Sequence, residues 1–272
     1  MLGNSISNQL AINSNFEVIR ANRQCALDSF LFDARRDNVE RLISRIKPDY
    51  VINSIMARKT EAGSKLANNF YLHTKFQKSL MEACVKNKSF LIQPATDAVF
   101  KSSTGANTEI SYKDGKSIYS RTKILGERYA NNTLFLRTSL LGIDLKEGYD
   151  PHLFSWLLSR PSHSSVNGFT NYLWNGISTN TFAQIVEQIM IVNFKEPRTQ
   201  HIVPANWLSK FQILEYITKS ANRLDLKIVP TELKRPIDLR LSTEFPDFNA
   251  FLFNLAGYSQ VPTIEKMIDL IV

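Results

Sequence analysis

The sequence has 272 residues, of which 43% are hydrophobic and 21% are charged, the composition of a globular protein long enough to bury a large core. No apolar run approaches the roughly 18 residues of a membrane-spanning helix, and the first residues lack the basic and apolar regions of a signal peptide. Two cysteines, Cys25 and Cys84, make no disulfide framework, and the four histidines lack metal-ligand spacing. We therefore expect a reduced, cytoplasmic protein with no metal site and no membrane association.

The formal net charge of +8 raises the question of a nucleic-acid partner. A nucleic-acid surface needs a basic patch interleaved with aromatic side chains. The basic residues that do cluster are Arg35, Arg36, Arg41, Arg45 and Lys47. They lie along one predicted helix, whose solvated face explains them. A mild positive field also suits a small polyanion such as a dinucleotide or a nucleotide-sugar, so we expect such a ligand and no nucleic acid.

Helical and strand patterns alternate over the first half of the chain. Apolar residues recur at helical spacing in 4–15, 37–47 and 65–86, and a further helix begins at Tyr119. Short apolar runs typical of strands lie at 16–19, 50–55, 89–96 and 133–137. This alternation predicts an α/β protein with a doubly wound parallel sheet. Ligands bind such sheets at the carboxyl ends of the strands, where Asp33, Asn53, Thr96 and Arg137 fall.

Beyond residue 142 the alternation weakens. The patterns predict helices at 150–160, 178–193 and 209–221 and from 263 onward, with short strands at 201–204 and 226–229. The stretch 167–176, rich in amide and aromatic side chains, is predicted to be a loop.

The spacing Tyr-x-x-x-Lys, which places a phenol and an ammonium on one helix face, occurs three times. The match at 112–116 runs into a Lys-Asp-Gly turn, and the match at 71–75 has no hydroxyl-bearing strand end just before it. Only Tyr119 and Lys123 follow a buried strand that ends in a hydroxyl, that of Thr96. Spacing alone still leaves open a half-buried tyrosine beside a surface lysine.

Three segments carry a family pattern: Thr96-Asp97 with Val99-Phe100, Tyr119-Ser-Arg-Thr-Lys123-Ile-Leu-Gly126-Glu127, and Leu136-Arg137-Thr138-Ser139. Supporting segments are Ile46-Lys-Pro-Asp-Tyr-Val-Ile-Asn53, Gly168-Phe-Thr-Asn171 with Trp174-Asn-Gly176, Leu208-Ser-Lys-Phe-Gln-Ile-Leu214, and Gly257-Tyr258. Together they resemble the extended short-chain dehydrogenase/reductase family, and within it the dTDP-4-dehydrorhamnose reductase (sugar-nucleotide-binding) branch. The resemblance covers nearly the whole chain. It implies a Rossmann-type doubly wound sheet with a small, discontinuous substrate-binding lobe.

The resemblance implies the roles of three catalytic residues. Tyr119 would protonate the C4 keto oxygen of a nucleotide-sugar as general acid, and Thr96 would hydrogen-bond the same oxygen. Lys123 would lower the pKa of Tyr119 by its positive charge and hold the nicotinamide ribose. The nicotinamide of NADPH or NADH would bring the hydride.

It also implies which residues surround the cofactor and the substrate. Those expected at the cofactor are Gly3, Arg20, Arg23, Asp33, Asn53, Ser54, Ile55, Asn69, Tyr119 and Lys123. Asp33 would contact the adenine, and Arg20 and Arg23 would lie where NADP carries its 2′-phosphate, although plain surface arginines would look the same. Those expected at the substrate are Thr96, Asp97, Asn171, Asn175 and Arg240. For the last three, ordinary loop packing is the alternative.

The first residues depart from the family pattern. The family opens with a strand and a Gly-x-x-Gly-x-x-Gly turn, whose backbone amides receive the pyrophosphate. Met1-Leu2-Gly3 match the last glycine and the two residues before it, so the sequence holds neither the first strand nor the first two glycines. Either Met1 is an internal methionine of a longer protein, which we favour because every later element is intact, or the chain is an impaired relative. A second departure is Ala95, where the family usually has serine.

We expect a dinucleotide-binding region at 1–142, completed by about 176–206, and a substrate lobe from 143–175 and 207–272. The expected function is NAD(P)H-dependent reduction of a 4-keto nucleotide-sugar, as in the biosynthesis of dTDP-rhamnose and polysaccharides. One alternative is a nucleotide-sugar epimerase or dehydratase, which Asp97 keeps open. The other is a non-catalytic regulatory homologue that binds the same ligands. The expected partner is the nucleotide-sugar, with a homodimer as an option.

Overall fold

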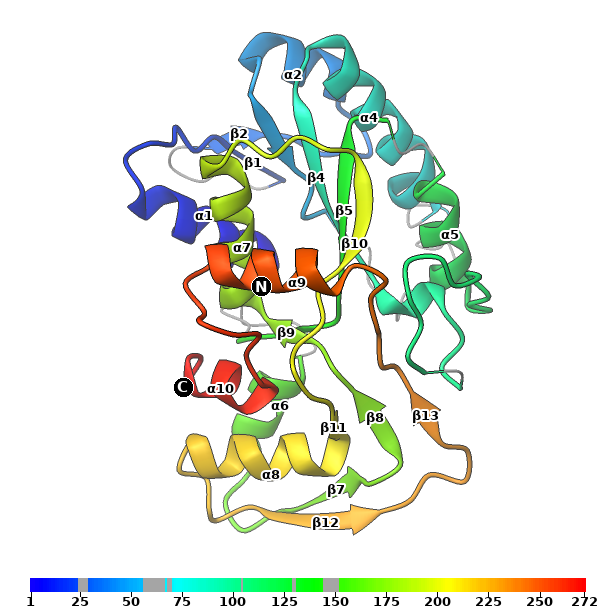
Figure 1. Cartoon of the computed structure of the whole chain (residues 1–272), viewed down its shortest axis with the longest axis vertical. Coiled ribbons are helices and arrows are strands. Elements are labelled where there is room, and N and C mark those ends of the chain that lie inside the picture. Colours follow the sequence, from blue (N-terminus) through cyan, green and yellow to red (C-terminus); the bar gives the residue numbers. More distant parts are fainter. Residues whose placement is uncertain (24–28, 56–66, 68–69, 104, 129–130, 144–151) are drawn as a thin grey trace.

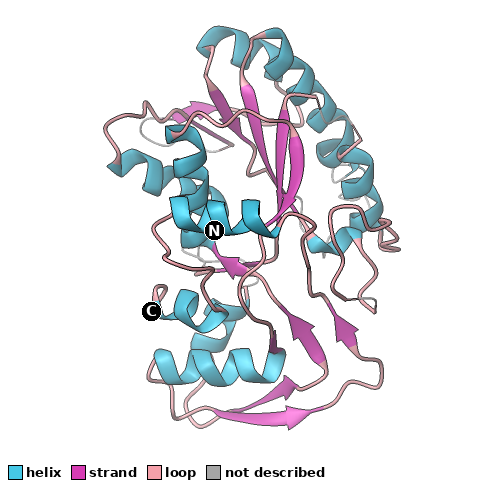
Figure 2. Cartoon of the chain, in the orientation of Figure 1, coloured by secondary structure: helices cyan, strands magenta, loops and turns pink. Residues whose placement is uncertain are grey.

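The computed structural model describes residues 1–23, 29–55, 67, 70–103, 105–128, 131–143 and 152–272. Its described part has two regions, visible in Figure 1 and coloured by secondary structure in Figure 2. One region is a parallel sheet with helices on both faces. The other, at the opposite end of the long axis, is built of short strands and helices from the later part of the chain.

The helices are α1 (Leu2–Ile12), α2 (Val39–Ile46), α4 (Gln77–Lys86), α5 (Ile118–Gly126), α6 (Leu153–Leu158), α7 (Thr179–Ile191), α8 (Lys210–Ser220), α9 (Pro246–Leu255) and α10 (Ile264–Asp269). A π-helical segment, η1 (Leu72–Phe76), leads into α4, and a 3₁₀ turn is η2 (Asp97–Val99). The strands are β1 (Arg20–Asn22), β2 (Ser29–Leu31), β3 (Tyr50–Ile52), β4 (Phe90–Ala95), β5 (Thr133–Arg137), β6 (Leu140–Leu141), β7 (Ser165–Phe169), β8 (Tyr172–Trp174), β9 (Ile177–Ser178), β10 (Arg198–His201), β11 (Leu208–Ser209), β12 (Lys227–Thr231) and β13 (Ile237–Asp238). In the described residues, no helix has the length and apolar character that a membrane crossing requires.

The main sheet has the strand order β10-β5-β4-β3, and every neighbouring pair is parallel. Helices α1, α7 and α9 lie on one side of it in Figure 1, and α2, α4 and α5 lie on the other. The predicted doubly wound parallel α/β fold is therefore confirmed.

The side chains of β4 and β5 alternate between two cores, as the pleat of a strand requires. Phe90, Ile92 and Leu134 join the larger cluster, which includes α1 and α7. Leu91 and Phe135 join the smaller cluster beneath α2 and α4. Burial on both faces explains why these strands are continuous apolar runs in the sequence.

Pro94 lies within the central strand β4, where a missing N–H normally costs a ladder hydrogen bond. The N–H of Phe90 donates to Asp49, at 2.9 Å, and that of Asn53 donates to Ile92, at 3.2 Å. Alternate β4 residues therefore face β3, and Pro94 is the next of them. Because β3 ends at Ile52, the proline falls where no strand hydrogen bond would form.

Strands β1 and β2 pair with each other, parallel, and form a sheet separate from the main one. The predicted strand at 16–19 is wrong, because the paired residues begin at Arg20; Phe16 and Val18 instead pack against the larger core.

On β3, Asp49 and Asn53 bond to β4, so the N–H and C=O groups of Tyr50 and Ile52 point away from it. Among the described residues no strand pairs with that edge.

The second region contains two small sheets, β12-β7 and β11-β8-β13, packed on α8. The prediction of a loop at 167–176 is wrong, because this stretch contains the end of β7 and all of β8. Their partners lie far along the chain: β7 pairs with β12 and β8 with β11 and β13. Local sequence carries no record of such distant pairing.

Candidate active site

Thr96 and Tyr119 meet at the carboxyl edge of the main sheet. Thr96 directly follows β4, and its hydroxyl oxygen caps η2 by accepting the N–H of Ala98 at 3.2 Å. Tyr119 is the second residue of α5, which Ser117 caps by accepting the N–H of Ser120 at 3.0 Å. The side chains of Thr96 and Tyr119 are hydrogen-bonded to each other. The Thr96 hydroxyl donates its one proton to Oδ1 of Asp97 at 3.1 Å, so it has to turn that proton toward a carbonyl oxygen before the oxygen can accept hydrogen bonds from both hydroxyls.

Tyr119 is protonated at neutral pH. Burial raises its pKa to about 12, and the charge of Asp97, which is 7% exposed, acts in the same direction. The ammonium of Lys123 lies 6.0 Å from the centroid of the tyrosine ring, over its face. Burial therefore outweighs the lowering that the charge of Lys123 is expected to exert on the pKa of Tyr119, and the pKa stays above its usual value. A protonated phenol is the form that a proton donor needs.

Lys123 lies one turn after Tyr119 on α5 and is half-buried. Burial lowers its pKa to about 8, and the carboxylate of Glu127 opposes that shift. The ammonium is thus still mainly charged at neutral pH, but it loses its proton far more easily than an exposed lysine.

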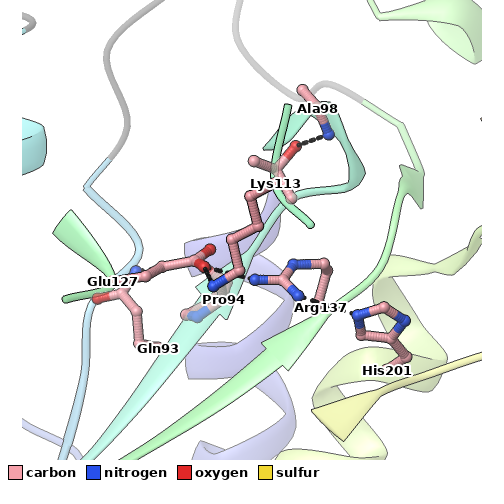
Figure 3. A network of polar contacts seen from close by, with 8 residues as sticks. Gln93, Pro94, Ala98, Lys113, Glu127, Arg137 and His201 are labelled. Atoms are coloured by element: carbon pink, nitrogen blue, oxygen red, sulfur yellow. Dashed lines mark hydrogen bonds and ion pairs between the residues drawn. The ribbon is translucent and has the colours of Figure 1, made fainter. Parts of the chain in front are cut away.

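A network of polar groups connects Lys113, Glu127, Arg137 and His201, and Figure 3 shows these residues as sticks. The carboxylate oxygen Oε2 of Glu127 accepts hydrogen bonds from Lys113 and Arg137, both at 2.5 Å. Arg137, fully buried at the end of β5, also donates to Nε2 of His201 at 2.9 Å. His201 in turn donates from Nδ1 to the carbonyl of Ser242 at 2.7 Å. Arg137 was expected among the ligand-facing groups, but its guanidinium serves this internal network instead.

The amino end of α1 lies against the end of β3. A Cβ on Gly3 would be 3.2 Å from Cβ of Ser54, so only a glycine fits here without displacing that serine. Met1, the residue before α1, makes no side-chain cap hydrogen bond to the first turn, whose backbone N–H groups have no partner within the helix. An uncapped helix amino end at this place fits the pyrophosphate of a dinucleotide.

The buried side chain of Asn53 makes three hydrogen bonds at the same edge of the sheet. Its amide nitrogen donates to Gln77 at 2.8 Å and to Gln93 at 2.9 Å, and its amide oxygen accepts the N–H of Ile55 at 3.1 Å. The side chain is 6% exposed. It therefore holds the backbone of Ser54 and Ile55 in place rather than offering a free group to a ligand. Asn69, the other amide expected here, lies outside the described residues.

The side chains expected near the adenine end lie around β1 and β2. Arg20 begins β1 and donates to Asn8 of α1 at 3.4 Å, while Arg23 follows β1 and is exposed. Asp33 follows β2 and is bound by Arg35 at 2.6 Å. Its hydrogen bond with Arg35 lowers the pKa of Asp33 to about 2, and Arg23 contributes. Arg20 and Arg23 therefore lie at the two ends of β1, Arg20 partly exposed and Arg23 exposed, where they can meet an anion.

On the second region, the two asparagines expected at the substrate hold backbone instead. Asn171 exchanges two hydrogen bonds with the backbone of Leu233, each at 2.9 Å. Asn175 does the same with Leu241, each at 2.7 Å. Both amides are therefore used in fixing the segment that leads to Arg240.

Arg240 is an ordered cation at the outer side of β13. It binds Asp238 at 2.7 Å, and its guanidinium lies 4.9 Å from the ring centroid of Trp207, which is 48% exposed. Arg240 directly precedes Leu241, whose N–H donates to the amide oxygen of Asn175 at 2.7 Å.

These geometries agree with a sequence match over almost the whole chain. The family model described as "RmlD substrate binding domain" matches residues 1–245. The chain belongs to this family. The resemblance inferred from the motifs is thereby confirmed, whereas a search of curated proteins gives no match.

Solved structures of similar fold include reductases and an epimerase. A hypothetical dTDP-4-dehydrorhamnose reductase from Sulfolobus tokodaii has 20% identity and a TM-score of 0.73, covering 88% of each chain. A dTDP-4-dehydrorhamnose reductase from Bacillus anthracis, in complex with NADP, has 16% identity and a TM-score of 0.71, covering 90% of this chain and 89% of that one. A UDP-glucuronic acid 4-epimerase from Bacillus cereus, in complex with UDP-glucuronic acid and NAD, has 14% identity and a TM-score of 0.76, covering 99% and 94%. At these identities the likeness establishes the fold.

Two residues of this family member escaped the sequence reasoning. Tyr172 of β8 has its pKa raised by burial and by Asp97, so the second region comes close to Thr96 through this side chain. His73 of η1 packs its ring against that of Tyr119, with the centroids 5.4 Å apart. The spacing did hold a signal for His73, because it falls at helical spacing with the buried Phe76 and Leu80.

Proposed function

We propose that this protein is an NAD(P)H-dependent reductase of a 4-keto nucleotide-sugar, with an activity like that of dTDP-4-dehydrorhamnose reductases. The observation that carries the proposal is the hydrogen-bonded pair of Thr96 and Tyr119 at the carboxyl edge of the sheet, with the Lys123 ammonium over the tyrosine ring. Two hydroxyls converging on one point suit a carbonyl oxygen that becomes an alcohol. The family supports the same reading, because its solved relatives include such reductases.

Each residue of the pair has a distinct role in the reaction. Tyr119, protonated by virtue of its high pKa, gives its proton to the keto oxygen as negative charge develops there. Thr96 donates a second hydrogen bond to that oxygen, and η2 holds its hydroxyl in position. Lys123 places a positive charge beside the phenol, which stabilises the phenolate left after proton transfer.

The bound nicotinamide supplies the hydride, and the chain offers residues to hold the dinucleotide. The uncapped first turn of α1, with Gly3 packed on Ser54, would receive the pyrophosphate. Arg20 and Arg23 would meet the adenosine ribose and its 2′-phosphate. Lys123 would hold the nicotinamide ribose, and Asp33, already bound to Arg35, would border the adenine.

We assign the dinucleotide to residues 1–142 with about 176–206, and the sugar-nucleotide to a lobe of 143–175 and 207–272. The charge of Asp97 raises the pKa of Tyr172, so these two side chains from the two parts are near each other, which supports assigning the sugar to the space beside them and Tyr119. In the lobe, Arg240 is the one expected contact whose cationic side chain stays partly exposed, so we assign it to the diphosphate.

A nucleotide-sugar epimerase or dehydratase is the second candidate. Asp97, buried beside Thr96, is an acid at the site that a simple reductase does not require. The epimerase among the solved relatives supports this alternative. A regulatory homologue that binds ligands without turnover is the third, and the separation of β1 and β2 from the main sheet supports it.

The three candidates differ in what happens to NADPH. The purified chain is incubated with NADPH and dTDP-4-dehydrorhamnose, and the absorbance of NADPH is followed while the sugar product is analysed. A reductase consumes NADPH in proportion to the alcohol formed. An epimerase or dehydratase converts UDP- or dTDP-sugars without net NADPH loss, and a regulatory protein binds NADPH in a fluorescence titration but converts nothing. Failure to bind NADPH or NADH would reject all three.

A further inference from the structure

His73 lies against the proposed proton donor and has no part in the reaction as described so far. It belongs to the π-helical segment η1 and is 4% exposed. Its ring meets the ring of Tyr119 edge to face, with an interplanar angle of 83° and centroids 5.4 Å apart. The contact is fixed by the backbone, because a Cβ on Gly126 would be 2.1 Å from the carbonyl oxygen of His73. Helix α5 therefore sits directly on this histidine.

Hydrogen bonds assign the tautomer of the ring. The hydroxyl of Thr122 donates its single proton to the carbonyl of Tyr119 at 2.9 Å. The same hydroxyl oxygen is 2.9 Å from Nδ1 of His73 and can only accept there. Nδ1 thus carries the proton, and Nε2 carries a free lone pair.

That lone pair is buried without a donor. Nε2 of His73 has no hydrogen-bond partner among the residues that the structure describes. Buried acceptors in native proteins are nearly always paired, and the exceptions call for an explanation. Burial and the nearby charge of Lys123 hold the pKa of His73 at about 3, so the imidazole is neutral at any physiological pH.

The matching donor is next to it. The Lys123 ammonium has three N–H groups, and within the described part of the chain none of them has a hydrogen-bond acceptor. It lies 6.0 Å from the centroid of the same tyrosine ring that His73 touches. An acceptor without a donor and a donor without an acceptor therefore border one phenol.

We propose that His73 is a positioning residue whose Nε2 accepts a hydrogen bond from the Lys123 ammonium, directly or through one water molecule. The bond anchors the charge of Lys123 beside Tyr119 and leaves two N–H groups for a ligand. The catalytic consequence rests on the proposed function, but the hydrogen bond itself does not. Other charged groups near this site are Glu127, which Arg137 and Lys113 already neutralise, and Asp97, whose charge acts on Tyr119.

A matched pair of variants isolates the lone pair. His73→Phe and His73→Gln both lose the hydrogen bond to Thr122. Only glutamine places an acceptor at the reach of Nε2, whereas phenylalanine keeps the ring contact with Tyr119. If His73 had a merely structural role, the phenylalanine variant would change the pKa of Lys123 less than the glutamine variant would. Our inference requires the reverse, and His163→Asn, at an exposed turn, serves as the control.

The primary readout is the pKa of Lys123, followed by NMR through the Cε signal of protein labelled with 13C-lysine and assigned by its loss in Lys123→Arg. We expect wild type, His73→Gln and His163→Asn to titrate together, and His73→Phe about one unit lower, because an ammonium that loses its acceptor gives up its proton more easily. If His73→Phe does not fold, His73→Leu takes its place. Equal titration of the phenylalanine and glutamine variants would overturn the inference.

The second readout is the pH profile of kcat, whose alkaline limb should move with the NMR value while the KM for the sugar changes little. An enzyme inactive on every 4-keto nucleotide-sugar would remove the proposed function, yet the NMR titration would still decide the role of His73. The two failures are therefore distinguishable.

Discussion

Glu127 follows Lys123 by four residues on α5, yet its carboxylate binds Arg137 at 2.5 Å and not the lysine. Lys113 donates a second hydrogen bond to the same oxygen. Arg137 and Lys113 therefore neutralise most of the charge of Glu127. Burial, rather than this carboxylate, decides the pKa of Lys123. This division explains how a lysine with an acid one turn away still has its pKa lowered to about 8.

Stability should rise with pH in a window set by Lys123. Its pKa is about 8 in the folded protein against about 10.5 in the unfolded chain, so the unfolded state binds more protons between these values. The free energy of unfolding thus gains from Lys123 as the pH rises from about 8 toward 10.5. We predict that Lys123→Met is more stable than wild type at pH 7, with the difference shrinking by pH 10.

Urea denaturation of both proteins at pH 7, 8, 9 and 10 measures this prediction. Ionisation of Tyr119 contributes to both proteins and largely cancels in the difference. A difference between them that stays constant over the series would contradict the lowered pKa.

Breaking the ion pair of Arg137 and Glu127 should lower the free energy of unfolding. Arg137 is fully buried and the side chain of Glu127 is 7% exposed, so removing Arg137 would leave this buried carboxylate with Lys113 as its remaining cation. Removing one member of such a pair typically costs about 3–5 kcal/mol. We predict a loss of that size for Arg137→Met, measured by urea denaturation at pH 7. The exposed pair of Lys86 and Glu40 is the control, and Lys86→Met should change stability little. A small loss for Arg137→Met would mean that the network relaxes.

Removing the phenol hydroxyl should stop proton transfer and spare cofactor binding. We predict that Tyr119→Phe lowers kcat by about 10²–10⁴, since that is the usual contribution of a general acid, while the Kd for NADPH changes little. Phenylalanine keeps the ring contact with His73. The control is Tyr112→Phe, because Tyr112 has the same spacing to a lysine but is 87% exposed. Full turnover by Tyr119→Phe would remove this residue as the acid.

The buried strands and the helix entering the site were predictable from sequence because their signals are local. Strand β5 was predicted at its observed bounds, since the apolar run Leu134–Leu136 lies at the centre of five consecutive buried residues. Thr96 was placed at a strand end by the same logic. Tyr119 was chosen from three matches because only one followed such a strand. These inferences need only short windows of sequence.

Other features of the site depend on partners far along the chain. Asn171 and Asn175 look like free amides in sequence, but each holds a backbone segment more than 60 residues later. The pKa of Tyr119 was expected to follow its neighbour Lys123, whereas burial by distant elements decides it. The role of His73 likewise depends on the approach of α5 across Gly126.

Cofactor choice should depend on the two arginines at β1. If Arg20 and Arg23 meet the 2′-phosphate, charge-assisted hydrogen bonds to it favour NADPH over NADH. We predict that the double variant Arg20→Ala/Arg23→Ala raises the Kd for NADPH about 10-fold or more and leaves that for NADH nearly unchanged. Titration of intrinsic fluorescence at fixed salt measures both values. Lys219→Ala, an exposed cation on α8, controls for the loss of net charge. If the Kd values for NADPH and NADH rise equally, the two arginines do not recognise the 2′-phosphate and are ordinary surface residues.

The open edge of β3 gives the last prediction. The N–H and C=O groups of Tyr50 and Ile52 face away from β4, and no described strand pairs with them. On β1 the same reasoning applies to Ala21, because the carbonyl of Asn22 accepts the N–H of Phe32, next to β2, and alternate residues face opposite edges. A parallel strand between β1 and β3 would join the two sheets and lead into the amino end of α1.

We predict that an extension of about five or six strand-forming residues followed by Gly-x-x-Gly, joined to Met1, pairs with β3 and tightens NADPH binding. Hydrogen exchange measures the pairing directly: the amides of Tyr50 and Ile52 should become protected, while that of Asn53, already bonded to Ile92, should change much less. An extension of equal length made of Gly and Ser controls for added chain. Unchanged exchange at Tyr50 and Ile52, together with an unchanged Kd, would mean that this edge does not accept a strand. Protection without tighter binding would instead separate the joining of the sheets from the making of the pyrophosphate site.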